Sequence, residues 1–270
     1  MNDSKMTWEA SVQWLREQPD QQDLVKAAFY DDPLIDAAER YAGSSEWAAV
    51  RTFLPVEKGA VLDVGAGRGI ASFALAKDGW YVTALEPNNS NLVGAGAIRG
   101  LATEALVNID VVQEWGESLP FADATFKVVH CRQVLHHARD LKKLCAEIYR
   151  VLKPGGTMIA TREHVISRKE DLVDFLNGHP LHHLYGGENA YLLKEYICAI
   201  VGAGLQMEHV FNPLASDINL YPSTLKATKL RMARRLGLPA WLIPNIALRI
   251  YGALGNAPGR VYTFVARKPA

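Results

Sequence analysis

A glycine-rich turn after a short apolar run constrains the fold of this chain more than any other feature. Residues 60–62 are apolar, and they lead through Asp63 and Val64 into a turn of sequence GAGRG at residues 65–69. An apolar run of this kind is typical of a strand buried on both faces of a sheet. Glycines allow the backbone to bend sharply and to approach a ligand closely. Helix-like sequence follows at residues 70–78, and the first N–H groups of a helix suit polar or anionic groups. We therefore expect a nucleotide-type binding turn here.

The spacing of the glycines narrows the kind of ligand. Gly65, Gly67 and Gly69 form G-x-G-x-G, whereas the dinucleotide fingerprint is G-x-G-x-x-G. The phosphate-binding pattern G-x-x-x-x-G-K-[ST] is absent, and Asp63 stands two residues before the first glycine. Because like charges repel in a partly desolvated site, this carboxylate favours a cationic ligand over a pyrophosphate.

Strand-like and helix-like segments alternate after the turn. Residues 81–85 are expected to form a second strand with Glu86 at its carboxyl end, where a carboxylate can hold a ribose diol. Further strands are expected at residues 109–113, 126–130, 157–161 and 260–266, with a helix ending near Val151. This order predicts an α/β fold with a mostly parallel, doubly wound sheet.

Several short segments occur in a recognisable order. They are GESLPF at residues 116–121, VLHH at 134–137 and LKPGG at 152–156. Together with the glycine turn, they resemble the class I S-adenosylmethionine-dependent methyltransferases of the type 11 group, over roughly residues 55–162. The resemblance implies a Rossmann-like sheet of about seven mostly parallel strands with an antiparallel last strand. It also implies S-adenosylmethionine, which carries a sulfonium and an ammonium, as methyl donor.

The resemblance also assigns the cofactor-binding residues. The turn residues Gly65, Ala66, Gly67 and Gly69 would approach the methionine part, and Asp63 would favour the ammonium directly or through water. Glu86, followed by Pro87, would bind the ribose; Trp115, Gly116 and Glu117 would surround the adenine; Arg132 and Gln133 would border the reacting centre. The group usually has an aspartate where Trp115 stands, so the indole could stack on the base, or Glu114 or Glu117 could make the polar contact. Lys127 replaces another common aspartate, and little functional change is expected from it.

Two histidines are candidates for a general base. His136 and His137 follow the fourth expected strand toward the active edge of the sheet, and His164 is a second choice. The alternative interpretation of His136 and His137 is helix capping or packing after the strand.

Two insertions are expected on the substrate side. The first, residues 164–190, contains His179, His182, His183 and Glu188, and is interpreted as a lid over the acceptor. No metal is expected, because no H-x-x-x-H or similar spacing supports one. The second, residues 214–256, contains a basic helix-like segment followed by an apolar one, with the basic residues Lys226, Lys229, Arg231, Arg234 and Arg235. Two interpretations are open: residues 226–250 make peripheral contact with a membrane, or they form a solvated helix face followed by a segment that packs on the core.

Composition sets broader limits. The 270 residues include 29 Lys plus Arg and 29 Asp plus Glu, so no global charge favours nucleic acid. Three cysteines without C-x-x-C spacing, a polar N-terminus and the absence of a long apolar stretch favour a cytoplasmic protein. We expect residues 1–54 to form a helical cap and residues 55–270 the methyltransferase domain, which acts on a small molecule or a glycan- or lipid-linked intermediate. The alternatives are a non-catalytic S-adenosylmethionine-binding partner protein and an NAD-dependent oxidoreductase. The oligomeric state is open.

Overall fold

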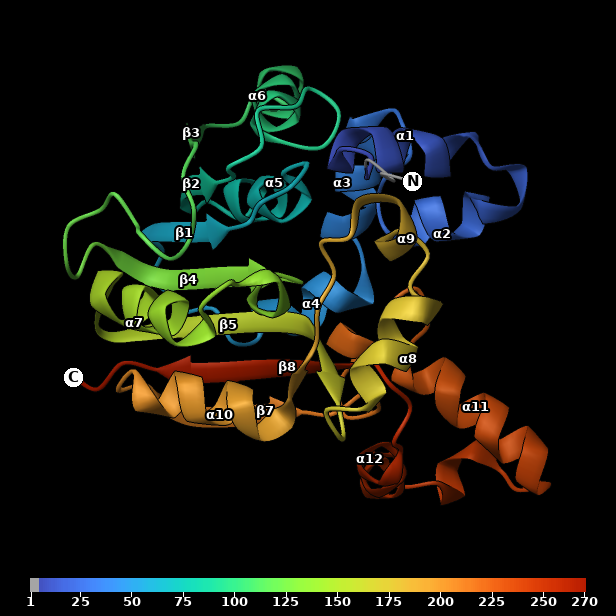
Figure 1. Ribbon diagram of the computed structural model, residues 1–270. Coiled ribbons are helices and arrows are strands. Elements are labelled where there is room, and N and C mark those ends of the chain that lie inside the picture. Colours follow the sequence, from blue (N-terminus) through green and yellow to red (C-terminus); the bar gives the residue numbers. More distant parts are fainter. Residues whose placement is uncertain (1–4) are drawn as a thin grey trace.

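One eight-stranded sheet forms the centre of the protein in the computed structural model, which describes residues 5–270 (Figure 1). The main strand order is β3-β2-β1-β4-β5-β8-β7, and the two-residue strand β6 pairs with β5. The strands are β1 Ala60–Val64, β2 Tyr81–Leu85, β3 Ile109–Val112, β4 Phe126–Arg132, β5 Leu152–Ile166, β6 Tyr191–Leu192, β7 Gln206–Phe211 and β8 Arg260–Arg267. Residues 1–4, the first four of the expected N-terminal cap, lie outside the described residues.

The strand directions confirm the expected fold class. β1, β2, β3, β4 and β5 run parallel to one another, while β8 is antiparallel to both β5 and β7. The seven strands of the main path, with the last one antiparallel, give the Rossmann-like sheet predicted from the sequence. The carboxyl ends of the parallel strands therefore meet at one edge, where open α/β sheets bind their ligands.

Helices cover both faces of this sheet (Figure 1). Side chains along β1 alternate between the two faces: Leu62 and Val64 pack in the apolar cluster on one face, and Val61 packs in the cluster on the other. The first cluster includes residues of α7 (Leu141–Val151) and α10 (Leu193–Gly202), and the second includes residues of α3 (Leu34–Ala42), α4 (Ser45–Arg51), α5 (Ile70–Lys77) and α6 (Ala95–Glu104). The side chain of Asp140 caps the start of α7 by accepting a hydrogen bond from the Lys143 N–H.

The remaining helices lie toward the carboxyl edge of the sheet or beyond it. They are α1 Trp8–Glu17, α2 Gln22–Ala27, α8 Asp171–Gly178, α9 His182–Tyr185, α11 Leu225–Leu236 and α12 Asn245–Leu254, with short 3₁₀ turns η1 Pro19–Gln21, η2 Leu135–His137, η3 Asp217–Asn219 and η4 Ala240–Leu242. α1 and α9 contact each other through Trp8 and Tyr185, whose ring centroids are 4.5 Å apart. The basic segment is helical, as expected, and forms α11.

The fifth strand differs from the expectation. It was expected to end at Thr161, but β5 continues to Ile166 past an irregularity in its pairing with β8 between Ala160 and Glu163. His164, where the expected lid begins, is therefore part of the sheet. The helix α10 begins only at Leu193, because Tyr191–Leu192 pairs with the end of β5. These long-range pairings override the local sequence pattern.

Candidate active site

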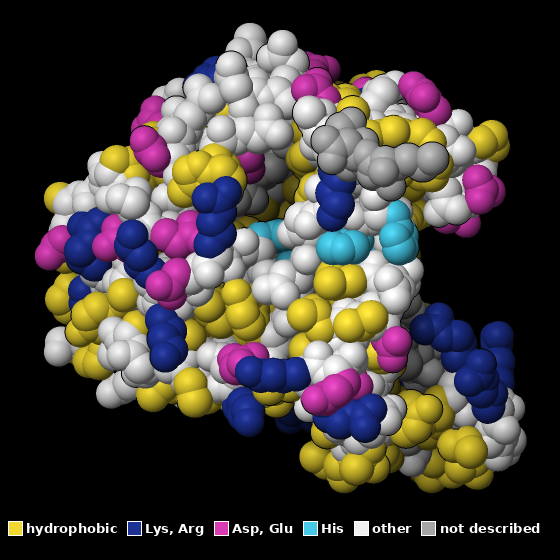
Figure 2. Space-filling model, in the orientation of Figure 1, with side chains coloured by type: hydrophobic (Ala, Val, Ile, Leu, Met, Phe, Trp, Pro, Cys, Tyr) yellow, Lys and Arg dark blue, Asp and Glu magenta, His cyan; other side chains and the backbone are white. Residues whose placement is uncertain are grey.

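A cavity of about 700 Å³ opens at the carboxyl edge of the sheet. Figure 2 shows histidine side chains at the margin of this hollow, beside the N-terminal helices. The cavity lining includes almost every cofactor-binding and catalytic residue expected from the sequence: Asp63, Gly65, Ala66, Gly67, Glu86, Pro87, Trp115, Gly116, Glu117, Arg132, Gln133, His136 and His137. Gly69 is the one expected residue that is not part of the lining. The parallel sheet thus brings segments that are far apart in sequence to one site.

The glycine turn and Glu86 form one hydrogen-bonded unit. The Glu86 carboxylate accepts from the N–H of Gly67 at 2.8 Å and from the N–H of Asn88 at 3.0 Å. The N–H of Ala66 donates to the carbonyl of Leu85. Burial raises the pKa of Glu86, although both backbone donors act against that shift. Because these turn amides are already engaged and a carboxylate lies beside them, the turn is unsuited to a pyrophosphate.

The glycines of the turn have different roles. Gly67 has a φ of +56° and lines the cavity, and a Cβ placed there would meet nothing within 4 Å. Gly69 is the N-cap of α5 with a φ of +84°, and a Cβ there would lie 3.2 Å from the side chain of Ile98. Gly67 therefore leaves open space for a ligand, whereas Gly69 allows the left-handed turn to pack against α6.

Asp63 is buried in a polar network inside the protein. Its Oδ2 accepts from the Ser72 hydroxyl at 2.6 Å, and its Oδ1 lies 2.8 Å from Nδ1 of His130 on β4. His130 is the residue paired with Asp63 across the two strands. Both carboxylate oxygens are therefore engaged, and Asp63 supports the turn from beneath while it lines the cavity.

The expected adenine side of the cavity is more open. The Trp115 side chain is 56% exposed, and the Arg139 guanidinium lies 4.9 Å from the centroid of its ring. The Glu117 carboxylate accepts a hydrogen bond from the backbone N–H of Arg139 at 2.9 Å. Trp115 thus presents an aromatic face that can stack on a base.

Arg132 links the cavity to the N-terminal helices. Its guanidinium donates to the carboxylate of Glu46 at 2.7 Å, and Glu46 is fully buried. The same guanidinium donates to the side chain of Gln133, which has a φ of +58°. Tyr41 and Trp47, two N-terminal aromatic residues, are fully buried in the core, whereas Tyr30 lines the cavity.

His136 is held by a buried carboxylate. Its Nδ1 lies 2.7 Å from Oε2 of Glu163, which also accepts from the His136 backbone N–H at 3.1 Å. A carboxylate only accepts hydrogen bonds, so Nδ1 carries the proton and Nε2 is left with a lone pair. Burial, and then the neighbouring His137 and His164, hold the pKa of His136 well below its usual value. His136 is therefore a neutral, oriented imidazole at pH 7.

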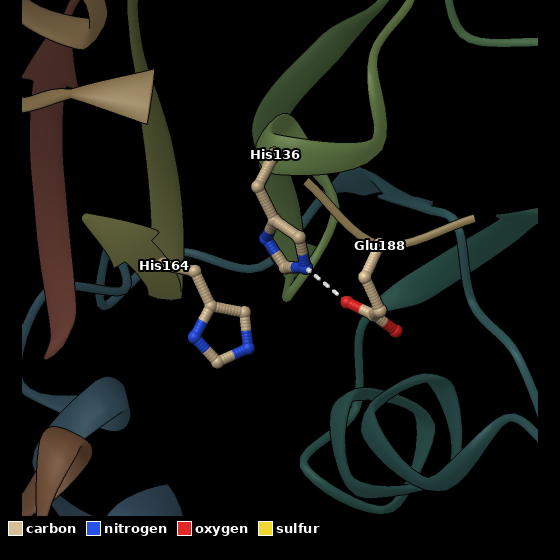
Figure 3. A group of neighbouring side chains, drawn as sticks. All are labelled: His136, His164 and Glu188. Atoms are coloured by element: carbon tan, nitrogen blue, oxygen red, sulfur yellow. Dashed lines mark ion pairs between the residues drawn. The ribbon is translucent and has the colours of Figure 1, made fainter. Parts of the chain in front are cut away.

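Glu188 and His164 complete this group, and both line the cavity (Figure 3). Oε2 of Glu188 is 3.9 Å from Nε2 of His136, and its Oε1 accepts from the Tyr185 hydroxyl at 2.5 Å. Burial alone would raise the pKa of Glu188, but His137, His179 and Tyr185 outweigh it and lower that pKa. Nδ1 of His164 lies 3.0 Å from the carbonyl of Gly259. Because a carbonyl only accepts, Nδ1 of His164 carries the proton.

His137 lies at the exposed side of the same region. Its Nδ1 is 3.0 Å from the carbonyl of Gly187, so that nitrogen carries the proton and Nε2 can accept one. The rings of His136 and His137 have centroids 4.2 Å apart.

Arg68 is a site residue that sequence reasoning missed. Its guanidinium donates to the carbonyls of Phe29, Asp31 and Leu92 at 2.9–3.0 Å and pairs with Asp32, and only 6% of the residue is exposed. It therefore ties the N-terminal cap and the loop before α6 to the glycine turn. A charged residue among three glycines was the available signal, but its partners lie 24–39 residues away.

Comparison with known proteins agrees with this geometry. The family model described as "Methyltransferase domain" matches residues 62–160. An uncharacterized methyltransferase of Bacillus subtilis, YcgJ, is 30% identical over 43% of this chain and 45% of its own length. A ubiquinone biosynthesis O-methyltransferase of Agrobacterium fabrum is 27% identical over 67% of this chain and 74% of its own. The alignment thus spans less than half of the first relative and about three quarters of the second.

The fold is shared with solved methyltransferase structures. A geranyl diphosphate methyltransferase solved in complex with S-adenosylmethionine aligns with a TM-score of 0.60 at 18% identity, covering 88% of this chain and 91% of that one. Residues 62–160 thus match the methyltransferase domain family, and the fold around them is the one that these solved methyltransferases share. The cavity fits the donor: Gly67 leaves open space, Glu86 presents a carboxylate, and Trp115 presents an aromatic face.

Proposed function

We propose that this protein transfers a methyl group from S-adenosylmethionine to a small molecule, with a lipid-linked intermediate as the favoured acceptor class. The observation that carries the proposal is the cavity at the carboxyl edge, which joins a donor side around Gly67 and Glu86 to a polar acceptor side around His136 and His137. Donor-binding and acceptor-facing groups in one cavity are what in-line transfer requires.

Each side of the cavity has a separate task in this proposal. Glu86 accepts hydrogen bonds from the ribose, and Trp115, Gly116 and Glu117 surround the adenine. Asp63 lines the cavity, and each of its oxygens has one partner and keeps a further lone pair, so it favours the ammonium directly or through water. S-adenosylmethionine supplies an electrophilic methyl group on a good leaving group. The enzyme therefore acts mainly by alignment, which can lower a barrier by up to about 7–11 kcal/mol.

His137 is the first candidate for the proton acceptor, and His136 is the second. Both line the cavity, and Nε2 of each carries a lone pair. A general base contributes about 10²–10⁴-fold, and only when the acceptor must lose a proton.

The helices α1, α2 and α9 cover the cavity. We propose that residues 5–54 act as a cap and residues 167–190 as a lid.

The acceptor class rests on a surface that lies apart from the cavity. Residues 225–254, the basic-apolar lobe, contain six Lys and Arg residues and no Asp or Glu. The same lobe exposes large apolar side chains: Leu236, Leu238, Trp241, Leu242, Ile246, Ile250, Tyr251 and Leu254. Figure 2 shows basic and apolar side chains together on this part of the surface. We propose that the lobe contacts an anionic membrane surface and brings a lipid-linked acceptor to the lid.

No helix among residues 5–270 has the length and apolar character to cross a bilayer, so the proposed contact is peripheral. The Agrobacterium relative, a ubiquinone biosynthesis O-methyltransferase, supports a small-molecule acceptor.

Transfer of a labelled methyl group tests the proposed function. Purified protein should move label from S-adenosylmethionine into one or more compounds of a panel of metabolites, isoprenoid-linked phenols and glycan intermediates. Binding of S-adenosylhomocysteine without transfer to any compound would favour the non-catalytic partner protein. Binding of NAD in place of either ligand would overturn the proposal.

A further inference from the structure

Three hydrogen-bond acceptors converge at the acceptor side of the cavity. His136 comes from the turn after β4, His164 from the end of β5, and Glu188 from the segment after α9 (Figure 3). One ligand atom of each lies within 4.8 Å of the others. The group thus gathers three separate segments of the chain around one point.

The hydrogen bonds behind each imidazole fix its tautomer. Glu163 takes the Nδ1 proton of His136, and the Gly259 carbonyl takes that of His164. The Nε2 atoms therefore carry lone pairs, and the Glu188 oxygen 3.9 Å from His136 is also an acceptor. Three acceptors that face one another repel unless a cation lies between them.

This arrangement is the one that metal-binding histidines adopt. A ligating imidazole commonly donates its other N–H to a carboxylate or a backbone carbonyl, which orients the ring toward the ion. Two histidines and one glutamate form a known catalytic zinc ligand set, with a further position left open. Ligand atoms about 2.0–2.1 Å from a tetrahedral zinc lie about 3.3 Å from one another. The three ligand atoms here lie within 4.8 Å of one another, so small side-chain rotations bring them to that spacing.

We propose that His136, His164 and Glu188 bind one divalent transition-metal ion, with Zn²⁺ as the reference ion. His179 is the nearest additional donor: its Nε2 is 3.8 Å from the Glu188 carboxylate. The absence of H-x-x-x-H spacing argued against a metal only within one helix; these ligands come from three separate segments.

The metal would select the acceptor, and this part of the inference rests on the proposed function. His136, His164 and Glu188 line the cavity, so an ion held by them would be accessible to an acceptor with an ionisable hydroxyl. Coordination lowers the pKa of a bound hydroxyl. The O–H bond would break and the proton would pass to Nε2 of His137. The oxygen would then take the methyl group as its bond to sulfur breaks, with S-adenosylhomocysteine as the second product. His136 serves as ligand and His137 as base, so the site would favour oxygen acceptors over nitrogen or carbon acceptors.

Direct metal titration tests the site without any turnover. Full-length, tag-free protein is stripped with a chelator and titrated with Zn²⁺ by calorimetry, and with Co²⁺ by visible absorption. We expect one ion per chain and a Co²⁺ spectrum of four or five coordination. His164→Ala and Glu188→Gln should weaken Zn²⁺ binding by about 100-fold or more, and Glu163→Gln by about 10–100-fold through its effect on His136.

His183→Ala is the matched control. His183 lies in the same segment, but it is exposed and its Nε2 bonds the carbonyl of Asn177 outside the group. It should bind Zn²⁺ as the unmodified protein does. Equal affinity in His164→Ala, Glu188→Gln and the unmodified protein would overturn the site, as would no binding at all. S-adenosylhomocysteine affinity, measured on the same variants, should change less than about 3-fold. Failure of metal binding alone therefore leaves the proposed methyl transfer intact.

Discussion

Glu86 is the residue on which the donor side of the cavity depends. The carboxylate is nearly buried, and two backbone N–H groups hold it at the carboxyl end of β2. Its local context, a strand end about 20 residues after the glycine turn, was sufficient to predict the position of this side chain. The hydrogen bond to Gly67 was not predictable, because it depends on how the turn folds back over the neighbouring strand.

Glu86→Gln should weaken binding of S-adenosylmethionine by about 10–100-fold, because hydrogen bonds to a charged group contribute about 1.5–3 kcal/mol. Isothermal titration calorimetry measures the change. Glu57→Gln is the matched control: Glu57 is exposed and lies just before β1, at the opposite end of that strand from the turn. An unchanged affinity in Glu86→Gln would overturn the ribose assignment.

His137→Ala should lower turnover more than donor affinity. Nε2 of His137 can accept a proton, and loss of a general base typically costs about 10²–10⁴-fold in rate. Steady-state kinetics on an identified acceptor, together with donor titration, separate the two effects. If turnover and affinity fall equally, or neither changes, His137 has no catalytic role.

Among the elements of the fold, the basic-apolar lobe was predictable from the sequence only in part. The helix α11 was predictable, because Thr224 caps its start and Gly237, in a left-handed conformation, ends it. The burial of Ala233, Ile243 and Leu248 in a small cluster of their own explains how the lobe stays folded while its other apolar side chains are exposed. The sequence did not show which apolar side chains of the lobe are buried and which are exposed; only the tertiary structure decided this.

The lobe should bind vesicles that contain anionic lipid. Co-sedimentation with phosphatidylglycerol vesicles is expected at low salt and should decrease at high salt, because surface charges are screened. A double variant, Arg234→Glu with Arg235→Glu, should abolish it, and Trp241→Ser should weaken it. Lys142→Glu with Lys143→Glu, on the exposed side of α7, makes the same change in charge elsewhere and should bind as before. Retained binding by the Arg234 and Arg235 variant would contradict membrane contact through the lobe.

For the whole molecule, the buried histidines link stability to pH. Burial is the first cause that lowers the pKa of His136, His164 and His179 below the usual 6.5. Below pH 6.5 the unfolded chain therefore binds protons that the folded chain does not, and the free energy of unfolding falls as pH falls. Each such histidine contributes up to about 1.4 kcal/mol per pH unit. Burial raises the pKa of Glu86 and Glu163, which gives the opposite trend above their usual 4.5.

Urea unfolding in a chelator from pH 7.5 to 5.5 checks this expectation. The unmodified protein should lose stability toward pH 5.5, and His164→Gln should lose less, because it lacks one of the depressed groups. A stability that is constant, or that rises toward pH 5.5, would contradict it.

The sequence by itself determined the order of strands and helices, the glycine turn, and the positions of Glu86 and the histidines after β4. Each of these depends on local patterns of apolar residues, glycines and strand ends, which neighbouring residues in the chain specify. Only the tertiary structure decided that β5 runs on to Ile166, that Arg68 ties the cap to the turn, and that His136, His164 and Glu188 meet. Those contacts join residues 24 or more positions apart, and pairing between strands and packing between layers, rather than local preference, bring them together.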